Sequence, residues 1–304
     1  MTSPITVTYR ERIAVITLNR PEKLNALDQD LYYQLGEHLR EIEKRDDISI
    51  TVLTGAGRFF SAYALSPAPT TATFRAYPRS HIHPSTEILT ACSGADVTAS
   101  RPSGALSSSA RRDILRSFVA NNIDVTRAFY SHSKILVVAL NGPVVGLSAA
   151  LVAFADFIYA TPHTFLLAPF ASLGLVAEGG ASRAFVERMG ISKANEALIM
   201  SKRITCAELE QTGFVNKVIS APSGNQTDSE GFLGKVLEEV DERLGAHLNQ
   251  SSLLKIKELI RRPGREVLER QNGIEAFMGL ERFLSGVPQE EFRRLASGEK
   301  KHKL

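Results

Sequence analysis

The stretch from Asn141 to Gly180 combines residue types that can act on a carbonyl compound. An apolar run, Ile135–Leu140, stops at Asn-Gly-Pro, which predicts a buried strand that ends in a turn. The small residues from Ser148 to Ala153 predict a helix packed against that strand. The first N–H groups of such a helix point back into the turn, where they can hold developing negative charge.

A carboxylate follows in the same stretch. Glu178 stands beside Gly179 and Gly180 in otherwise apolar surroundings. Backbone donors, a single acid and an apolar wall are what proton transfer next to a carbonyl requires. The alternative is a strand–turn–helix core in which Glu178 only caps a helix.

Composition excludes several functional classes. A chain of 304 residues that is 43% hydrophobic can bury a sizeable core. A net charge of +3 without a basic stripe argues against nucleic-acid binding. Cys92 and Cys206 are the only cysteines, so we expect neither a disulfide framework nor a metal site. Because no apolar run reaches membrane-spanning length, we expect no membrane segment.

The elements that must position these groups begin with an alternation of strand and helix. Ile13–Leu18 and Ile48–Thr54 are predicted strands. Between them, Asp28 is a plausible N-cap for a helix that places Leu31 and Leu35 on its apolar face. This βαβ unit predicts parallel pairing with a right-handed crossover.

Further helices are predicted over 111–130, 181–189, 192–200 and 231–297, and a short strand over 214–219. Thr205 is predicted to cap another helix, with Glu208 in the capping-box position. The chain therefore divides into a core (1–219), a linker (220–230) and a C-terminal helical region (231–304).

Several of these segments together resemble the crotonase (enoyl-CoA hydratase/isomerase) superfamily. The resemblance rests on motifs in the right order: Asn19–Leu27, Val52–Gly55, Phe60–Ala62 with Gly94–Asp96, Asn141-Gly142, Asp156–Ala160, and Gly174-Leu175 with Glu178–Gly180. It implies an α/β fold, a spiral of ββα/βαβ turns followed by a helical C-terminal trimerisation region. It also implies an acyl-CoA substrate, with coenzyme A as part of the substrate and no separate cofactor, and a homotrimer or a dimer of trimers.

The resemblance assigns two groups of site residues. The backbone N–H groups of Ala95 and Leu147 would form an oxyanion hole for the thioester oxygen. The substrate-binding loops around these donors would contain Gly94, Asp96, Gly146 and Ala62. The loop along the CoA moiety would contain Lys23, Leu24 and Ala26.

The acids decide the expected chemistry. Hydratases of the superfamily carry two glutamates, and the corresponding positions here are Ala150 and Phe170. Glu178 instead matches the single catalytic glutamate of fungal peroxisomal Δ3,Δ2-enoyl-CoA isomerases, whose local pattern is reproduced from Pro169 to Gly180. The implied role is to take a proton from C2 of a 3-enoyl-CoA and return it at C4. An apolar wall of Phe170, Leu173 and Leu175 would raise the pKa of Glu178.

Two alternatives remain open. One is a hydratase-type enzyme acting on fatty-acid or secondary-metabolite acyl chains, and the other is a catalytically impaired acyl-CoA-binding homologue. His302-Lys303-Leu304 resembles the C-terminal address that the peroxisomal import receptor reads, so we expect the protein in the peroxisome.

One segment departs from the family pattern. Residues 63–93 are rich in Pro, Thr, Ser and Ala, and deleting them restores a continuous Ser-Ala-Gly-Ala-Asp loop. We hypothesise a retained intron, because Ala62-Tyr63, Leu89-Thr90 and Cys92-Ser93 can be encoded with splice-donor, branch-point and acceptor bases. The competing interpretation is a genuine insertion that serves as a lid, in which Ala64 could take the place of Ala95 in the turn.

Overall fold

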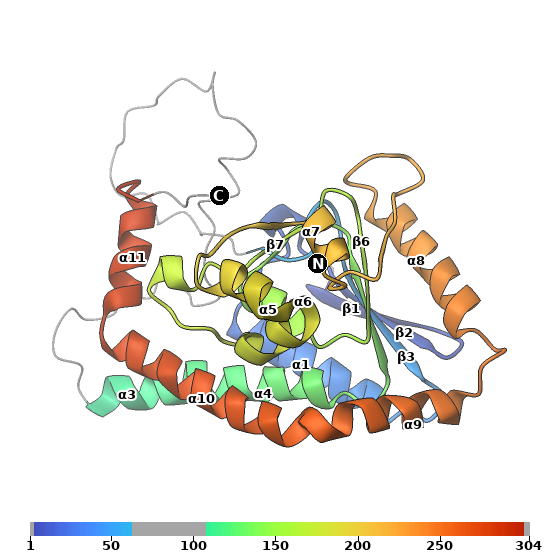
Figure 1. The fold of residues 1–304 in the computed structure, drawn as a ribbon, viewed down its shortest axis with the longest axis horizontal. Coiled ribbons are helices and arrows are strands. Elements are labelled where there is room, and N and C mark those ends of the chain that lie inside the picture. The colour runs from blue at the N-terminus through green and yellow to red at the C-terminus, as the bar shows by residue number, and fades with distance from the viewer. Residues whose placement is uncertain (1–2, 63–107, 301–304) are drawn as a thin grey trace.

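A six-stranded sheet lies at the centre of the computed structural model, which describes residues 3–62 and 108–300 (Figure 1). Its strands, in spatial order, are β1 (Ile5–Arg10), β2 (Ile13–Leu18), β3 (Ile50–Gly55), β4 (Ile135–Leu140), β6 (Phe157–Ala160) and β9 (Lys217–Val218). β1 and β2 pair antiparallel, and every other neighbouring pair is parallel. The predicted α/β class is confirmed.

A second, smaller sheet stacks beside the first. It consists of β5 (Val144–Val145), β7 (Phe165–Leu167) and β8 (Ile204–Thr205). A parallel bridge between Ser61 and Val144 connects this sheet to the loop that follows β3. The chain thus passes from one sheet to the other in successive turns, as a spiral does.

The predicted βαβ unit is β2, α1 (Gln29–Glu43) and β3. Asp28 caps α1, because its side chain accepts a hydrogen bond from the Leu31 N–H at 3.0 Å. The apolar face of α1 is buried, and β2 and β3 pair in parallel as predicted.

The helix predicted over 111–130 is interrupted. It consists of α3 (Ser108–Ile114), a π-helical turn (Leu115–Val119) and α4 (Ala120–Ser131). A π turn widens the helix by one residue per turn, which changes the direction of the side chains it carries. One of these is Phe118.

The central stretch forms α5 (Leu147–Val152) directly after β5, and then a 3-10 turn (Ala171–Leu173) and α6 (Ala181–Leu198). Gly190, at φ 74° and ψ 160°, breaks α6 where two helices were predicted. Thr205 and Glu208 form the predicted capping box of α7 (Cys206–Gln211).

The strand predicted over 214–219 is shorter in the structure, because β9 is only Lys217–Val218. Val215 donates its backbone N–H to the carbonyl of Leu209 at 3.0 Å, so this part of the chain still closes the end of α7. Only after that turn is the backbone free to pair with β6.

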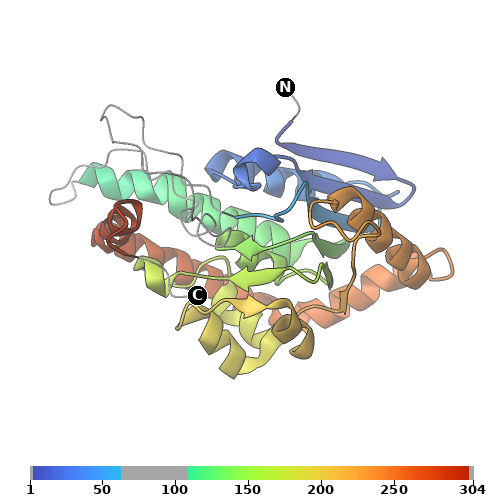
Figure 2. The ribbon, with the colours of Figure 1, turned by 90° about the horizontal axis from the view of Figure 1, so that it is seen from above.

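Four helices follow: α8 (Ser229–Leu244), α9 (Gln250–Arg261), α10 (Arg265–Leu284) and α11 (Val287–Ala296). α8 covers one face of the large sheet through Phe232, Val236 and Val240. α9 and α10 run along the lower side of the molecule in Figure 1, with α10 against α4. The view in Figure 2 shows the same helices from above, with α6 on the side opposite β1.

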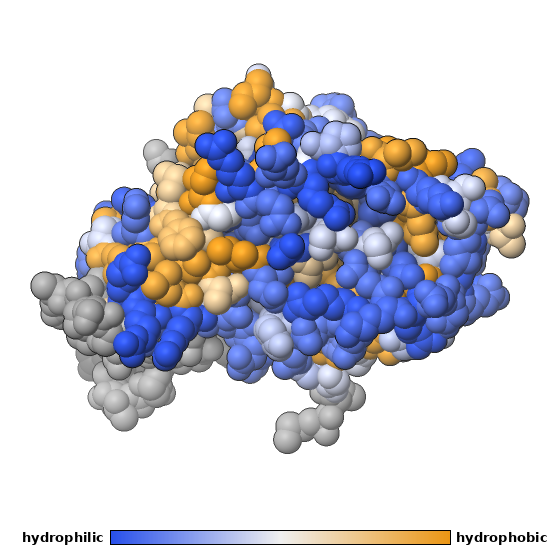
Figure 3. Space-filling view, turned by 90° about the horizontal axis from the view of Figure 1, so that it is seen from below, coloured by the Kyte–Doolittle hydropathy of each residue, from blue (hydrophilic) through white to orange (hydrophobic). Residues whose placement is uncertain are grey.

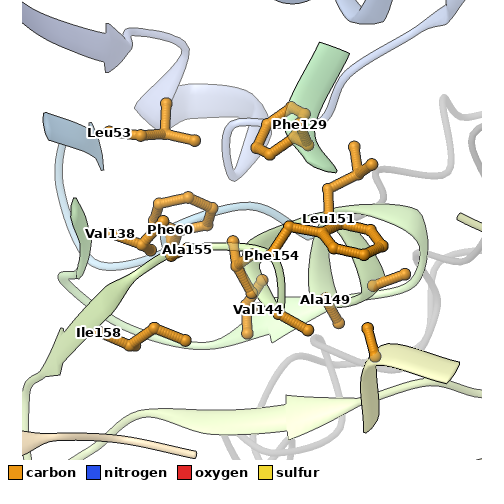
Figure 4. Packing of buried hydrophobic residues seen from close by; sticks show 14 of the residues in the cluster. Leu53, Phe60, Phe129, Val138, Val144, Ala149, Leu151, Phe154, Ala155 and Ile158 are labelled. Atoms are coloured by element: carbon orange, nitrogen blue, oxygen red, sulfur yellow. The ribbon is translucent and has the colours of Figure 1, made fainter. Parts of the chain in front are cut away.

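The main core lies between the two sheets and helices α1, α4, α5 and α6. Phe60, Phe129 and Phe154 fill it together with β-branched and small residues, as Figure 4 shows. Ala149 and Ala150 of α5 are fully buried in the same cluster, so α5 sits close to its neighbours. This close packing fixes the helix that borders the candidate site.

Candidate active site

A largely apolar pocket opens between α1, α4, α5 and the end of α10, with about 470 Å³ of empty space, including open solvent at its mouth. Its walls come from elements that are far apart in the sequence. The lining residues are Gln29, Tyr32, Phe118, Asn121, Asn122, Val125, Leu147, Leu175, Glu178 and Phe283. Of these, Glu178 is the only carboxylate, so the described part of the pocket offers one acid–base group.

Glu178 is 9% exposed and accepts a hydrogen bond from Asn122 Nδ2 at its Oε2 atom, at 3.1 Å. Asn122 Oδ1 also accepts the backbone N–H of Gly179 at 3.3 Å, so one amide holds both the side chain and the adjoining turn. Burial raises the pKa of Glu178 to about 8. The negative charge of Glu275 adds to this rise, and the Asn122 hydrogen bond opposes it. Such a carboxylate can both take up and release a proton near neutral pH.

The two glycines after Glu178 allow its turn to approach α5. Gly179 has a φ of 67°, and a Cβ there would lie 2.6 Å from Leu147 Cδ1 and 2.9 Å from Ala150 Cβ. Gly180 has a φ of 72°, and a Cβ there would lie 2.6 Å from Phe154 Cζ. Only glycine fits these positions. The small Ala150 therefore faces the turn that carries Glu178.

Three hydroxyl groups form a chain along one wall. Tyr32 Oη lies 2.9 Å from Ser148 Oγ, and Ser148 Oγ lies 2.9 Å from Ser61 Oγ. Ser61 donates its proton to the carbonyl of Asn25 at 3.0 Å. A carbonyl only accepts, so Ser148 must donate to Ser61 and Tyr32 to Ser148. Burial raises the pKa of Tyr32, and in this arrangement its hydroxyl proton is directed to Ser148.

Two asparagines of the recognised motifs shape the loop after β3. Asn25 Nδ2 donates to the carbonyls of Ala56 and Phe59, at 2.9 and 2.7 Å. Asn141 Nδ2 also donates to the Phe59 carbonyl, at 3.1 Å, and its Oδ1 accepts the Gly55 N–H. These bonds satisfy buried backbone groups and direct the chain toward Ala62. Asn25 and Asn141 therefore have a structural role, which is to hold the loop after β3 in place.

The structure brings only some of the predicted site residues together. Glu178 and Leu147 line the pocket, and Gly146 immediately precedes Leu147. Ala62 is buried at the end of the loop after β3, where its N–H bonds to the Leu24 carbonyl at 2.9 Å. Lys23, Leu24 and Ala26 lie outside the pocket lining, with Lys23 exposed. Gly94, Ala95 and Asp96 lie outside the described residues.

The predicted apolar wall needs correction. Leu175 lines the pocket, but Phe170 and Leu173 do not. Both are buried elsewhere, Phe170 in the main core and Leu173 against α10 and α11. The wall around Glu178 comes instead from Phe118, Val125, Leu147 and Phe283, because the π turn, α4, α5 and α10 converge there. The alternative that Glu178 caps a helix also fails, since α6 has no cap bond from its N-cap residue and Glu178 bonds to Asn122.

Sequence reasoning missed Asn122, Tyr32 and Glu275. Nothing in the local sequence marks them, because each is one polar residue within an amphipathic helical pattern. Over residues 3–62 and 108–300, no group of three or more His, Cys, Asp or Glu side chains could hold a metal ion. The helices in these ranges include none that is long and apolar enough to cross a membrane.

Comparison with known proteins gives consistent matches. Two models described as enoyl-CoA hydratase/isomerase match residues 13–63 and 91–230. A Delta(3,5)-Delta(2,4)-dienoyl-CoA isomerase from Pyricularia oryzae is 55% identical over 304 residues, covering 100% of both chains. A 3,2-trans-enoyl-CoA isomerase from Saccharomyces cerevisiae is 34% identical, covering 95% of this chain and 93% of the relative.

Solved structures show the same fold. An enoyl-CoA hydratase/isomerase from Pseudoalteromonas atlantica superimposes with a TM-score of 0.73 at 21% identity, covering 99% of this chain and 100% of the other. The motif order, the sheet spiral and these matches agree. This chain is therefore a member of the enoyl-CoA hydratase/isomerase (crotonase) superfamily.

Proposed function

We propose that this protein is a Δ3,Δ2-enoyl-CoA isomerase in which Glu178 moves one proton from C2 to C4 of a 3-enoyl-CoA. The observation that supports this most is a single buried carboxylate, with its pKa raised to about 8, in an apolar pocket. Glu178 takes the C2 proton, and the electrons of that C–H bond delocalise over the thioester oxygen, C2 and C4 as a dienolate. The C3=C4 π electrons then form the new C4–H bond, the electrons at C2 form C2=C3 and the thioester carbonyl is restored. The protonated Glu178 then returns the proton at C4.

The dienolate intermediate carries negative charge on the thioester oxygen. We assign its stabilisation to the backbone N–H groups of Leu147, at the start of α5, and Ala95, as the family resemblance implies. Losing one donor of an oxyanion hole typically costs about 2.7–4 kcal/mol of transition-state stabilisation. The Lys23–Ala26 loop adjoins Ala62 and would lie along the CoA moiety.

The test is turnover of a 3-enoyl-CoA, followed by the absorbance of the conjugated thioester product. Glu178→Gln should lower kcat by roughly 10²–10⁴-fold, as expected for loss of a general acid–base group, while acyl-CoA binding is retained. Glu187→Gln is a matched control, because Glu187 lies on α6 in a surface ion pair with Arg183. Wild-type protein that binds acyl-CoA without turnover would instead support the impaired binding homologue.

A second candidate is a Δ3,5-Δ2,4-dienoyl-CoA isomerase, favoured by the name of the 55% identical relative. That reaction moves a proton between C2 and C6, which are twice as many bonds apart as C2 and C4. Among the described residues the pocket holds only Glu178, which favours the shorter C2-to-C4 transfer. Parallel assays with a 3-enoyl-CoA and a 3,5-dienoyl-CoA decide between them. Faster turnover of the dienoyl substrate would overturn the proposal.

Hydratase chemistry is disfavoured by the same geometry. Two acids would be needed to position and activate water, and their positions hold Ala150 and Phe170, both fully buried and apolar. Hydration of a 2-enoyl-CoA that survives Glu178→Gln would restore that alternative.

Assembly and location are proposed on separate grounds. The face in Figure 3 carries apolar patches. α9 and α10 expose Ile256, Leu259, Ile260, Val267, Ile274, Phe277 and Met278. Such a surface suits contact between copies, and we propose a homotrimer, to be checked by light scattering.

We also propose peroxisomal import through His302-Lys303-Leu304, to be checked by locating an N-terminally tagged protein with and without this tripeptide.

A further inference from the structure

Helix α6 begins directly after the Glu178 turn, and its capping group comes from another helix. Gly180, at the N-cap position, provides no side chain, but Glu275 of α10 accepts the backbone N–H of Gly180 at 2.6 Å and that of Ser182 at 3.0 Å. It also accepts the Ser182 hydroxyl, and Gln271 Nε2 donates to that hydroxyl oxygen at 2.8 Å. Glu275 thus takes up donors that the first turn of α6 leaves free.

This cap matters because of where the helix starts. The N-terminus of a helix carries partial positive charge and stabilises nearby carboxylates. Glu178 lies two residues before Gly180, so a bare α6 terminus would favour its ionised form and weaken it as a base. Glu275 is 3% exposed, and its carboxylate occupies those donors and offsets their charge.

We propose that Glu275 is a positioning residue for the proposed isomerase: it fixes the Glu178–Ser182 turn and withholds the positive end of α6 from Glu178. The kinetic consequence of this inference rests on the proposed function. The effect of Glu275 on the ionisation of Glu178 does not. The C-terminal helical region thereby takes part in the acid–base chemistry as well as covering the core.

Few other charges face Glu178 within the described residues. α1 contributes Tyr32, which is neutral, and α4 contributes the uncharged Asn122. α5 and the π turn present the apolar Leu147 and Phe118. The negative charge of Glu275 raises the pKa of Glu178 in addition to burial, in agreement with the geometry. Burial also raises the pKa of Glu275, whereas its three hydrogen bonds to Gly180 and Ser182 favour its ionised form.

The experiment is the pH dependence of kcat/KM for Glu275→Gln in the full chain. The amide oxygen can still accept from the α6 terminus, but the charge is gone. The acidic limb of this pH profile reports the ionisation of Glu178. It should move to lower pH by roughly one unit, the size of pKa shift that one nearby charge produces. The plateau at high pH should fall, because a weaker base transfers protons less readily. Gln271→Ala removes the hydrogen bond to the Ser182 hydroxyl without removing a charge. It should leave the acidic limb of the pH profile unchanged.

A direct titration separates this inference from the proposed function. The infrared carboxyl band that disappears in Glu178→Gln reports the protonation of Glu178 in the absence of turnover. If this band titrates with a midpoint at lower pH in Glu275→Gln than in wild type, the inference is supported even if no isomerase activity is found. An unchanged midpoint overturns it, whatever happens to the activity. Should Glu275→Gln not fold, Gln271→Glu adds charge beside Ser182 and must move the midpoint to higher pH, and no movement again overturns the inference.

Discussion

At the scale of the residue, the fold and the proposed reaction favour opposite protonation states of Glu178. Its ordinary pKa of 4.5 rises to about 8 in the fold, so the folded state favours its protonated form. A raised pKa of this kind contributes stability that is fully present below pH 4.5 and lost as pH rises through about 8. The base that the reaction needs is therefore the form that the fold disfavours.

Glu178→Gln should consequently stabilise the protein at alkaline pH. The gain in unfolding free energy should be small at pH 5 and largest near pH 9. It should reach the order of a few kcal/mol, because one pKa unit corresponds to about 1.4 kcal/mol. Chemical denaturation of wild type and variant at both pH values measures it. An equal difference at the two pH values would contradict the ionisation argument.

At the scale of the element, the π turn and α10 together form the end of the pocket. Phe118 from the π turn meets Phe283 of α10 edge-on, with ring centroids 4.8 Å apart, and both rings line the pocket. Gly279 of α10 leaves room for Phe118, since a Cβ there would lie 2.6 Å from Phe118 Cε1. The position of the Phe118 ring thus depends on a residue on the neighbouring helix.

Gly279→Ala should push Phe118 toward the pocket and shorten the space for an acyl chain. We expect kcat/KM to fall more for long-chain than for short-chain 3-enoyl-CoA substrates. Gly273→Ala is the matched control, because it is on the same helix and a Cβ there meets nothing within 4 Å. A uniform fall across all chain lengths would show that the Phe118–Phe283 end does not select substrate.

At the scale of the whole molecule, residues 63–93 are the segment that the sequence predicts to depart from the family pattern. One family match ends at residue 63 and the other begins at residue 91. Ala62, the last described residue before the insertion, is already hydrogen-bonded to Leu24, so the loop is fixed up to that point. The proposed donor Ala95 lies beyond it.

Removing residues 63–93 should therefore restore a short oxyanion loop. If the segment is a retained intron, the shortened protein should isomerise 3-enoyl-CoA at least tenfold faster than the full chain, roughly the effect of regaining part of one oxyanion donor. Far-ultraviolet circular dichroism should show the helices and strands of residues 3–62 and 108–300 in both proteins. Equal activity would instead identify the segment as a tolerated or functional loop, and sequencing of mature transcript tests the intron directly.

The sequence by itself determined the features that depend on neighbouring residues. The strands Ile13–Leu18 and Ile135–Leu140, the Asp28 and Thr205 caps and the break at Gly190 follow from local periodicity and turn chemistry. The motif order also indicated the superfamily. The two- and three-residue strands of the small sheet were missed, because so short a segment has no period.

Only the tertiary structure decided what surrounds Glu178. Asn122 lies 56 residues from Glu178 in the chain, and Glu275 lies 95 residues from Gly180. Tyr32 and Ser148 meet across 116 residues. No local pattern encodes such contacts, because they exist only when separate helices pack against one another. Glu178 was identifiable as an acid from its motif, but its strength as a base is a property of the packed helices around it.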